Sequence, residues 1–263
     1  MYFQRDDIAK FCASLGYIRT MPSHTHLVEL INRFYDRVPF TNIMMLVRGR
    51  RTPSNSEITE DILSFCGGPC GHLNPFFRDV LEYLGYSAYL VPAWMRGSMS
   101  HIALIVTLDG DDYWVDVGNG HPYFTPLSIN KSDIASHCGL SYKLQSLGNN
   151  SFQILQRVNE ETEFSLNYRF ENTPVEFEFF DQMVYSHYTS EHFGPFRTSL
   201  RLIRYSNQEM FAIRDYEFLR YCDGSFEKSV LNSDDMIIEY VKNHFNHFKY
   251  PVKQAIRALG WSG

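Results

Sequence analysis

Long hydrophobic runs are missing from this sequence. Its longest apolar stretches, such as residues 102–106, are far too short to cross a lipid bilayer as a helix. The first seven residues, MYFQRDD, contain no apolar segment of the kind that a secretory signal peptide carries. We therefore expect a cytoplasmic protein without membrane association.

Clusters of basic residues are also missing. The 24 Lys and Arg residues are dispersed along the chain and are outnumbered by 30 Asp and Glu, which gives a formal net charge of −6. A surface for nucleic acid or for an anionic membrane needs positive charge gathered in one place. The composition therefore favours small molecules or other proteins as partners.

The sequence also lacks a disulfide pattern. Its five cysteines are odd in number and irregularly spaced, which favours reduced thiols in a reducing compartment. No internal repeat, low-complexity tract or Pro- or Ser-rich linker divides the chain. We therefore expect at least one thiol to be free for chemistry, and the predicted segments to pack together around a cleft.

Core-forming residues, in contrast, are abundant. Of the 263 residues, 44% are hydrophobic and 16% aromatic, which is enough for one large domain or for two to three small ones. Hydrophobic periodicity predicts helices over residues 5–15, 26–37, 58–65 and 74–84, and again over 233–248 and 252–259. It predicts strands over residues 88–91, 101–108, 113–117, 142–147, 152–158 and 163–170, and two more within 198–215. Residues 176–193 are mixed, with aromatic residues at helical spacing.

One cysteine stands out by its position. Cys70 follows a Gly-Gly pair in the segment FCGGPCGHLN (residues 65–74), four residues before the start of a predicted helix. The positive end of a helix dipole favours a thiolate, so a cysteine at the head of a helix is a good nucleophile. We interpret Cys70 as the candidate catalytic nucleophile.

Two further residues are suited to activate this cysteine. A cysteine nucleophile needs a base that takes its proton and usually a third group that orients the base. His101 begins an apolar strand, and Asp116 lies inside the apolar segment YWVDVG. Burial of a carboxylate in such a segment is costly unless the carboxylate is paired. We therefore predict a triad of Cys70, His101 and Asp116.

Strand register is the obstacle to this hypothesis. If the turn at residues 109–112 places Leu108 opposite Tyr113, then Asp116 pairs with Ile105, whose side chain lies on the same face as that of His101. Ile105 and His101 are still roughly 13 Å apart along the strand. We therefore expect a bulge, an asymmetric loop or strong twist to bring Asp116 to His101.

Other interpretations of these residues remain open. Taken alone, Cys70 could be a small core residue, His101 a hydrogen-bonded strand residue and Asp116 a buried turn-former. A zinc site built from Cys66, Cys70, His72 and His101 lacks the paired spacing of structural zinc motifs, so we expect no metal. His72 is two residues from Cys70 and does not share its face of a helix, so we do not expect it to be the base.

The motifs form a recognisable series along the chain. GGPC at residues 67–70 is followed by Asn74, SH at 100–101 begins an apolar strand, and VDVGNG occupies 115–120. In this combination the sequence resembles the arylamine N-acetyltransferase family, whose nucleophile motif reads RGGxCxExN and whose aspartate motif reads VDVGFG. The family's Cys-His-Asp triad has similar spacing.

Weaker matches extend the resemblance in both directions. VPFTN at residues 38–42 resembles the family's PFEN element. Phe180-Asp181 and residues 185–196 resemble the region that precedes a β-hairpin in the family. The resemblance therefore spans residues 8–219.

The resemblance implies an α+β fold in a papain-like cysteine transferase arrangement. That fold comprises an N-terminal helical bundle, a central β-barrel-like domain and a C-terminal α/β lid. We place these parts at residues 1–85, 86–195 and 196–263. The first would carry Cys70, and the second would carry His101 and Asp116.

The resemblance also implies a ping-pong mechanism. The Cys70 thiolate, paired with protonated His101, would take an acyl group from a thioester such as acetyl-coenzyme A. An amine, most simply an aromatic amine or hydrazine, would then attack the acyl-cysteine while His101 accepts a proton. Asp116 would hold the productive tautomer of His101, and backbone N–H groups, including that of Cys70, would bind the oxyanion. The acyl thioester is a cosubstrate, and we expect no tightly bound cofactor.

Three charged residues of the family's motifs are replaced in this sequence. The Arg before Gly-Gly is Cys66, the Glu after the nucleophile is His72, and the Glu of PFEN is Thr41. The chain therefore lacks one cation and two anions of the family's motifs, which suggests a different arrangement of charged residues beneath the triad. Four aromatic residues are equally suited to a substrate pocket and to the core: Tyr123, Phe124, Tyr185 and Phe193.

These departures keep other functions open. An amide synthase, or another acyltransferase on the same triad, would take its acyl chain from a carrier protein. A cysteine hydrolase has the same order of Cys, His and Asx residues and differs in the acceptor, which is water. A non-enzymatic binding module would follow only if the triad is not assembled.

Overall fold

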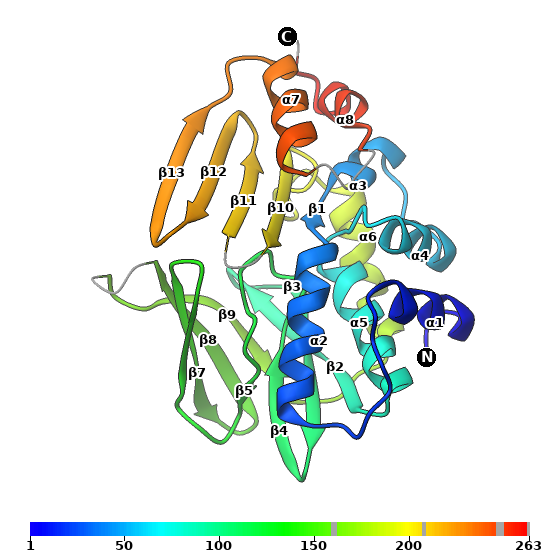
Figure 1. Ribbon diagram of the computed structural model, residues 1–263, viewed down its shortest axis with the longest axis vertical. Coiled ribbons are helices and arrows are strands. Elements are labelled where there is room, and N and C mark those ends of the chain that lie inside the picture. The colour runs from blue at the N-terminus through cyan, green and yellow to red at the C-terminus, as the bar shows by residue number, and fades with distance from the viewer. Residues whose placement is uncertain (159–161, 207–208, 246–249, 262–263) are drawn as a thin grey trace.

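The computed structural model describes residues 1–158, 162–206, 209–245 and 250–261. Figure 1 shows helices from the N-terminal part on one side, a large curved sheet below them, and a smaller sheet with two helices near the C-terminus. The fold is α+β, as predicted. None of the described helices is both long and apolar enough to span a membrane.

The N-terminal helices pack against the larger sheet through their apolar faces. Ser23 and Ser54 cap two of them, because their side chains accept hydrogen bonds from backbone N–H groups of the first turn. The helix after Cys70 begins at that residue, four residues before the predicted start. The helices are α1 (Arg5–Ser14), α2 (His24–Arg37), α3 (Ile43–Arg48), α4 (Asn55–Leu63) and α5 (Cys70–Leu84). The short helix α3 was not predicted.

The larger sheet is antiparallel and curls on itself, with β5 approaching β7. Its strand order is β5-β4-β3-β2-β9-β8-β7-β6, which matches the predicted barrel-like form. Its strands are β2 (Ser87–Met95), β3 (Ser98–Leu108), β4 (Asp111–Val115), β5 (Leu127–Ser128), β6 (Ile134–His137), β7 (Leu140–Gly148), β8 (Ser151–Val158) and β9 (Ser165–Glu171).

The turn between β3 and β4 is shorter than the sequence analysis assumed. Asp109 and Gly110 form it alone, with φ of 54° and 87°, and Leu108 pairs with Asp111 rather than with Tyr113. Two-residue hairpin turns with positive φ at both positions favour Asp-Gly. The predicted register was therefore wrong by two residues.

This shift moves Asp116 toward His101. Leu104 pairs with Val115, the last residue of β4, so Asp116 follows one residue later, beyond the end of the strand. A bulge also interrupts the β2–β3 ladder next to the pair of Ala93 and His101, and a bulge re-aims the side chains around it. The shorter turn accounts for two of the four residues that separated the two side chains in the expected register; the β3–β4 pairing itself contains no bulge among the described residues.

The smaller sheet has the order β1-β10-β11-β12-β13. Helices α7 and α8 pack on one of its faces and form a separate apolar core with it (Figure 1). Its strands are β1 (Phe40–Thr41), β10 (Arg201–Ser206), β11 (Glu209–Arg214), β12 (Glu217–Cys222) and β13 (Ser225–Val230). The helices are α7 (Asp234–His244) and α8 (Val252–Ala258); residues 246–248 of the helix predicted over 233–248 lie outside the described residues.

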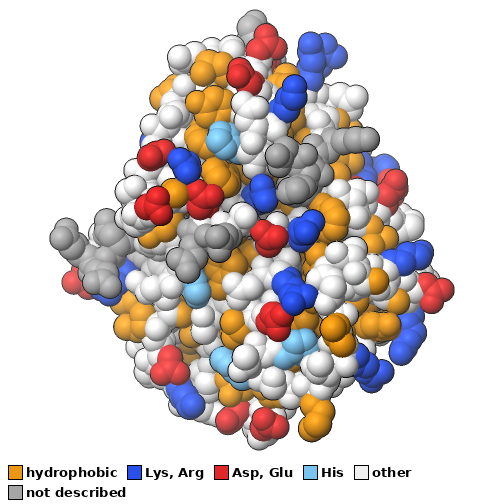
Figure 2. Space-filling model, viewed as in Figure 1, with side chains coloured by type: hydrophobic (Ala, Val, Ile, Leu, Met, Phe, Trp, Pro, Cys, Tyr) orange, Lys and Arg blue, Asp and Glu red, His pale blue; other side chains and the backbone are white. Residues whose placement is uncertain are grey.

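A long connection, residues 172–200, joins the two sheets. It contains η1 (Phe177–Phe180) and α6 (Asp181–Thr189), within the segment that the sequence marked as mixed. Strand β1, from the N-terminal part, pairs with β10 of the smaller sheet. The three-part division at residues 85 and 195 stays a prediction. Figure 2 shows side chains of both charges interspersed over the face that it presents.

Candidate active site

The Gly-Gly pair shapes the loop that holds the nucleophile. Gly67 has φ of +67°, and a Cβ there would lie 1.9 Å from the carbonyl oxygen of Pro39. A Cβ on Gly68 would lie 2.5 Å from Nδ1 of His72. Only glycine permits these two close approaches. The loop therefore packs directly against Pro39 and His72, and Cys70 follows it as the first residue of α5.

The three predicted catalytic residues lie together. Cys70 and His101 are each 2% exposed and Asp116 is fully buried. His101 Nε2 donates a hydrogen bond to Asp116 Oδ2 at 2.7 Å. Cys70 lies within electrostatic reach of the same imidazole, whose second nitrogen is Nδ1. The arrangement is that of a nucleophile, a base and a group that orients the base.

The carboxylate of Asp116 is fully hydrogen-bonded. Oδ1 accepts from Asn74 Nδ2 at 2.9 Å and from the backbone N–H of Gly118 at 3.0 Å. Oδ2 accepts from the Tyr168 hydroxyl at 2.7 Å in addition to His101. These donors compensate for the burial of a charged group and fix the carboxylate in place.

Two of these donors had no assigned role in the sequence analysis. Asn74 was noted only as a motif match. Tyr168 lies on β9, and no sequence pattern linked it to the site. The Tyr168 hydroxyl also accepts a 2.8 Å hydrogen bond from Trp114 Nε1.

The environment of His101 favours its charged form. Burial acts to lower the pKa of His101, but the negative charges of Asp116 and Cys70 and their hydrogen bonds outweigh burial and raise the pKa to about 10. At neutral pH the imidazole is therefore protonated, and it presents a positive charge to Cys70.

Cys70 and His101 open into a cavity of about 530 Å³ between the two sheets. Its apolar wall comes from Phe40, Met95, Phe193, Pro195, Phe196 and Ile203, and three arginines also line it: Arg96, Arg201 and Arg214. Of the four aromatic residues left open by the sequence, Phe193 lines this cavity. Tyr123 and Phe124 are buried in the core, and Tyr185 is exposed.

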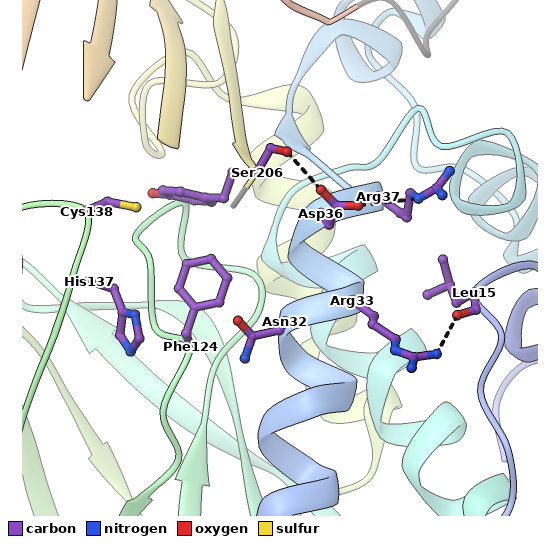
Figure 3. A pocket seen from close by; sticks show the side chains of 10 residues that line it. Leu15, Asn32, Arg33, Asp36, Arg37, Phe124, His137, Cys138 and Ser206 are labelled. Atoms are coloured by element: carbon purple, nitrogen blue, oxygen red, sulfur yellow. Dashed lines mark hydrogen bonds and ion pairs between the residues drawn. The ribbon is translucent and has the colours of Figure 1, made fainter. Parts of the chain in front are cut away.

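A second cavity, of about 480 Å³, lies between α2 and β10 (Figure 3). The carboxylate of Asp36, on its wall, already accepts a 3.0 Å hydrogen bond from Ser206 and lies 3.5 Å from Arg37 Nε. None of the three triad residues is among the described residues that line it. The first cavity, and not the second, therefore contains candidate triad residues.

A buried ion pair lies near two of the replaced motif residues. Arg48 donates two hydrogen bonds to Asp61, at 2.5 and 2.8 Å. The backbone N–H of Cys66 donates to the Asp61 carbonyl oxygen, and the charge of Arg48 contributes to lowering the pKa of His72. The Arg48–Asp61 pair thus supplies a cation and an anion in the region where the motif charges are missing.

His72 and Thr41, which replace charged residues of the family's motifs, each form a hydrogen bond within the protein. Nε2 of His72 shares a 2.9 Å hydrogen bond with the Tyr188 hydroxyl. Burial, with a smaller contribution from the charge of Arg48, lowers the pKa of His72 to about 3, so its imidazole is neutral. Thr41 Oγ1 accepts from the backbone N–H of Ile43. Neither side chain is among the described residues that line the catalytic cavity.

Comparison with known proteins identifies the family. A family model described as N-acetyltransferase matches residues 25–248, which is most of the chain. The chain belongs to the arylamine N-acetyltransferase family. The family is one of acyltransferases.

Solved arylamine N-acetyltransferases share the whole fold. The enzyme from Mycobacterium abscessus is similar with a TM-score of 0.85 at 15% identity, over 98% of this chain and 97% of that one. The enzyme from Mycobacterium marinum in complex with CoA is similar with a TM-score of 0.82 at 17% identity, over 96% of this chain and 98% of that one. At these identities the likeness concerns the fold alone.

A closer sequence match is partial. Over 118 residues the chain is 34% identical to proansamycin X synthase from Amycolatopsis mediterranei (strain S699). The match covers 41% of this chain and 44% of that protein, so the chain spans less than half the length of this curated relative. Membership of the arylamine N-acetyltransferase family therefore leaves the donor and the acceptor unspecified.

Proposed function

We propose that the protein transfers an acyl group, most simply acetyl, from a coenzyme A thioester through acyl-Cys70 to an amine. The observation that carries this proposal is the 2.7 Å hydrogen bond from His101 to Asp116. His101 lines the same cavity as Cys70, which is the first residue of α5. Membership of an acyltransferase family and a relative bound to CoA support the choice of reaction and donor.

In the first half-reaction the Cys70 thiolate attacks the thioester carbonyl. The charge of protonated His101 stabilises the thiolate, and the head of α5 offers backbone N–H groups that have no partner within the helix. These N–H groups, including that of Cys70, are suited to bind the oxyanion of the tetrahedral intermediate. Collapse of the intermediate expels the thiol of the donor, which takes a proton from His101.

In the second half-reaction His101 acts as a base. Once Cys70 is a neutral thioester, its negative charge no longer raises the pKa of His101. The pKa therefore falls, and the imidazole becomes able to accept a proton from the attacking amine. Asp116 holds Nε2 throughout, so that Nδ1 stays directed to the reacting atoms.

Intact mass spectrometry after incubation with acetyl-coenzyme A tests this proposal. We expect one acetyl group on Cys70, absent from Cys70→Ala and removed by an added amine. Release of free acetate at the same rate without any amine would instead indicate a cysteine hydrolase. A protein that stays unmodified with every acyl thioester would contradict the proposal.

The likeness to proansamycin X synthase favours a second candidate, an amide synthase whose donor is an acyl chain on a carrier protein. The triad and the acyl-Cys70 intermediate would be the same. Labelling of Cys70 by a longer acyl thioester or an acyl carrier protein, with none from acetyl-coenzyme A, would select this candidate.

A further inference from the structure

The backbone that carries Asp116 is irregular. Residues 116–121, here called the aspartate loop, belong to none of the described strands or helices. Regular ladders of backbone hydrogen bonds therefore do not fix this loop, and its polar groups need other partners. Four of its residues line the catalytic cavity: Gly118, Asn119, Gly120 and His121. The contacts that hold the aspartate loop therefore also determine where Asp116 lies.

Two tyrosine hydroxyls hold this loop from other parts of the chain. The hydroxyl of Tyr35, on α2, lies 2.7 Å from the carbonyl oxygen of Asp116 and 3.0 Å from that of His121, which share its proton. The hydroxyl of Tyr205, on β10, donates to the carbonyl oxygen of Gly120 at 2.8 Å. One helix and the smaller sheet thus both reach the aspartate loop.

Both hydroxyls are permanent donors. Burial raises the pKa of Tyr35 and of Tyr205 well above the ordinary value, and the charge of Asp116 adds to this effect at Tyr35. Neither phenol therefore ionises at physiological pH. The two side chains are only 3% and 2% exposed, so water has little access to replace them at the carbonyl oxygens.

A shared aromatic cluster fixes the rings that carry these hydroxyls. The ring centroid of Phe124 lies 4.6 Å from that of Tyr35 and 5.7 Å from that of Tyr205. The two tyrosine rings are 5.4 Å apart and nearly perpendicular, which is a preferred geometry for aromatic pairs. Phe124 and Tyr205 also line the second cavity, between α2 and β10 (Figure 3). The hydroxyls are therefore held in place by packing on their far side.

The peptide unit between Asp116 and Val117 is bound at both of its polar ends. In a trans peptide the carbonyl oxygen and the following N–H point in opposite directions. Tyr35 binds the oxygen, and the N–H of Val117 donates to Asn74 Oδ1 at 2.9 Å. The peptide plane is thus fixed between α2 and α5. The direction in which the Asp116 side chain leaves the backbone is fixed with it.

We propose that Tyr35 and Tyr205 are positioning residues, whose hydroxyls hold the aspartate loop so that the Asp116 carboxylate stays aligned with His101. The proposal rests on the proposed acyl transfer and adds two residues to its machinery. Neither tyrosine is among the described residues that line the catalytic cavity, so both act through the backbone. Tyr35 binds the carbonyl of Asp116 itself and has the larger effect.

Titration of His101 tests this alignment directly. Tyr35→Phe and Tyr205→Phe remove the hydroxyls and keep the rings. Long-range ¹H–¹⁵N spectra, assigned with His101→Gln, follow the protonation of the imidazole. Burial lowers the pKa of His101, but Asp116 and Cys70 raise it to about 10 overall. A misaligned carboxylate supports this proton less, so the midpoint should fall by about one pH unit in Tyr35→Phe and by a smaller amount in Tyr205→Phe.

Acylation of Cys70 by acetyl-coenzyme A is the second measurement. The leaving thiol takes its proton from His101, so acylation declines at the pH where His101 loses that proton. In Tyr35→Phe this alkaline limb should move to lower pH. The maximal rate of acylation at neutral pH should fall about tenfold, and the KM for acetyl-coenzyme A should stay unchanged, because the hydroxyl does not face the cavity.

Tyr17→Phe is the matched control. Tyr17 is also buried, and its hydroxyl donates to the carbonyl oxygen of Leu30 on α2 rather than to the aspartate loop. Loss of this hydroxyl should reduce the free energy of unfolding as in Tyr35→Phe, but should leave the His101 midpoint and the alkaline limb of the parent. A tyrosine whose variant keeps the parent midpoint has no positioning role. Two such variants, or an equal shift in Tyr17→Phe, would overturn the proposal.

The titration also separates this proposal from the proposed function. It needs no acyl donor, so lower midpoints in both variants would support the positioning role even if acetyl never reached Cys70. A parent that forms acetyl-Cys70, together with variants that match it in midpoint and acylation rate, would contradict the positioning role and leave acyl transfer intact.

Discussion

Nδ2 of Asn74 donates a 2.9 Å hydrogen bond to Oδ1 of Asp116, although 42 residues separate them in the sequence. The same amide donates to the carbonyl oxygen of Ile102 at 2.6 Å, next to His101, and its oxygen accepts from the N–H of Val117 at 2.9 Å. One side chain on α5 therefore contacts both segments that carry His101 and Asp116.

Asn74→Ala should slow acylation of Cys70 by roughly a hundredfold, because small displacements of catalytic groups have effects of that size. It should also reduce the free energy of unfolding by about 1–3 kcal/mol, since the buried N–H of Val117 loses its acceptor. Asn32→Ala, at an exposed asparagine on α2, is the control. A shifted pH–rate profile would show that Asn74 positions the triad, and an unchanged acylation rate would refute this role.

Gly118→Ala should also disturb the triad. A Cβ on Gly118 would lie 2.8 Å from Cys70 Cα and 2.8 Å from Asn74 Nδ2. The loop after Asp116 must then move away from α5, and we expect at least about a tenfold loss of kcat/KM. Gly224→Ala, where a Cβ meets no atom within 4 Å, should leave activity unchanged. Full activity in Gly118→Ala would show that this close approach is not needed.

Local features of the site were predictable from the sequence. The Gly-Gly pair and the following helix placed Cys70, and the alternation of apolar residues in the strands placed His101 and Asp116 on one side. The register was not predictable, because the choice between a two-residue turn at Asp109 and a four-residue turn depends on pairing energies along the whole hairpin.

Contacts between residues far apart in the chain could not be predicted from the sequence. Tyr168 reaches Asp116 from β9, and Arg201 and Arg214 reach the cavity from the smaller sheet. No local pattern marks such residues, because their proximity depends on how two sheets pack. Strand β13 was missed for a different reason: every residue in it is exposed, so hydrophobic alternation gives no signal.

The Arg48–Asp61 pair should contribute to stability as a unit. Its side chains are 11% and 4% exposed. Arg48→Met leaves the Asp61 carboxylate buried without its partner and should cost about 3–5 kcal/mol. In Arg48→Met/Asp61→Asn the loss should be smaller than the sum of the single losses, as measured by urea unfolding in a double-mutant cycle. Strictly additive losses would mean that the two residues do not act together.

His72 should make the protein sensitive to acid. Its pKa is lowered to about 3 in the folded state, against about 6.5 in an unfolded chain. The unfolded state therefore binds more protons between these values, and stability falls as the pH drops from 6.5 toward 3, by up to about 1.4 kcal/mol per pH unit. His72→Gln should reduce this slope, as measured by urea unfolding between pH 4.5 and 7.5. His24→Gln, at an exposed histidine, should keep it, and an equal slope in His72→Gln would contradict the assignment.

The most direct test of the central claim is the rate at which Cys70 is acetylated and discharged. The enzyme is mixed rapidly with acetyl-coenzyme A, quenched at intervals, and the peptide that contains Cys70 is weighed, with and without an amine acceptor. We predict that acetyl-Cys70 forms at least as fast as steady-state turnover, accumulates without amine and disappears when amine is present. Formation of the amide while Cys70 stays unmodified, or acetylation slower than turnover, would contradict the account.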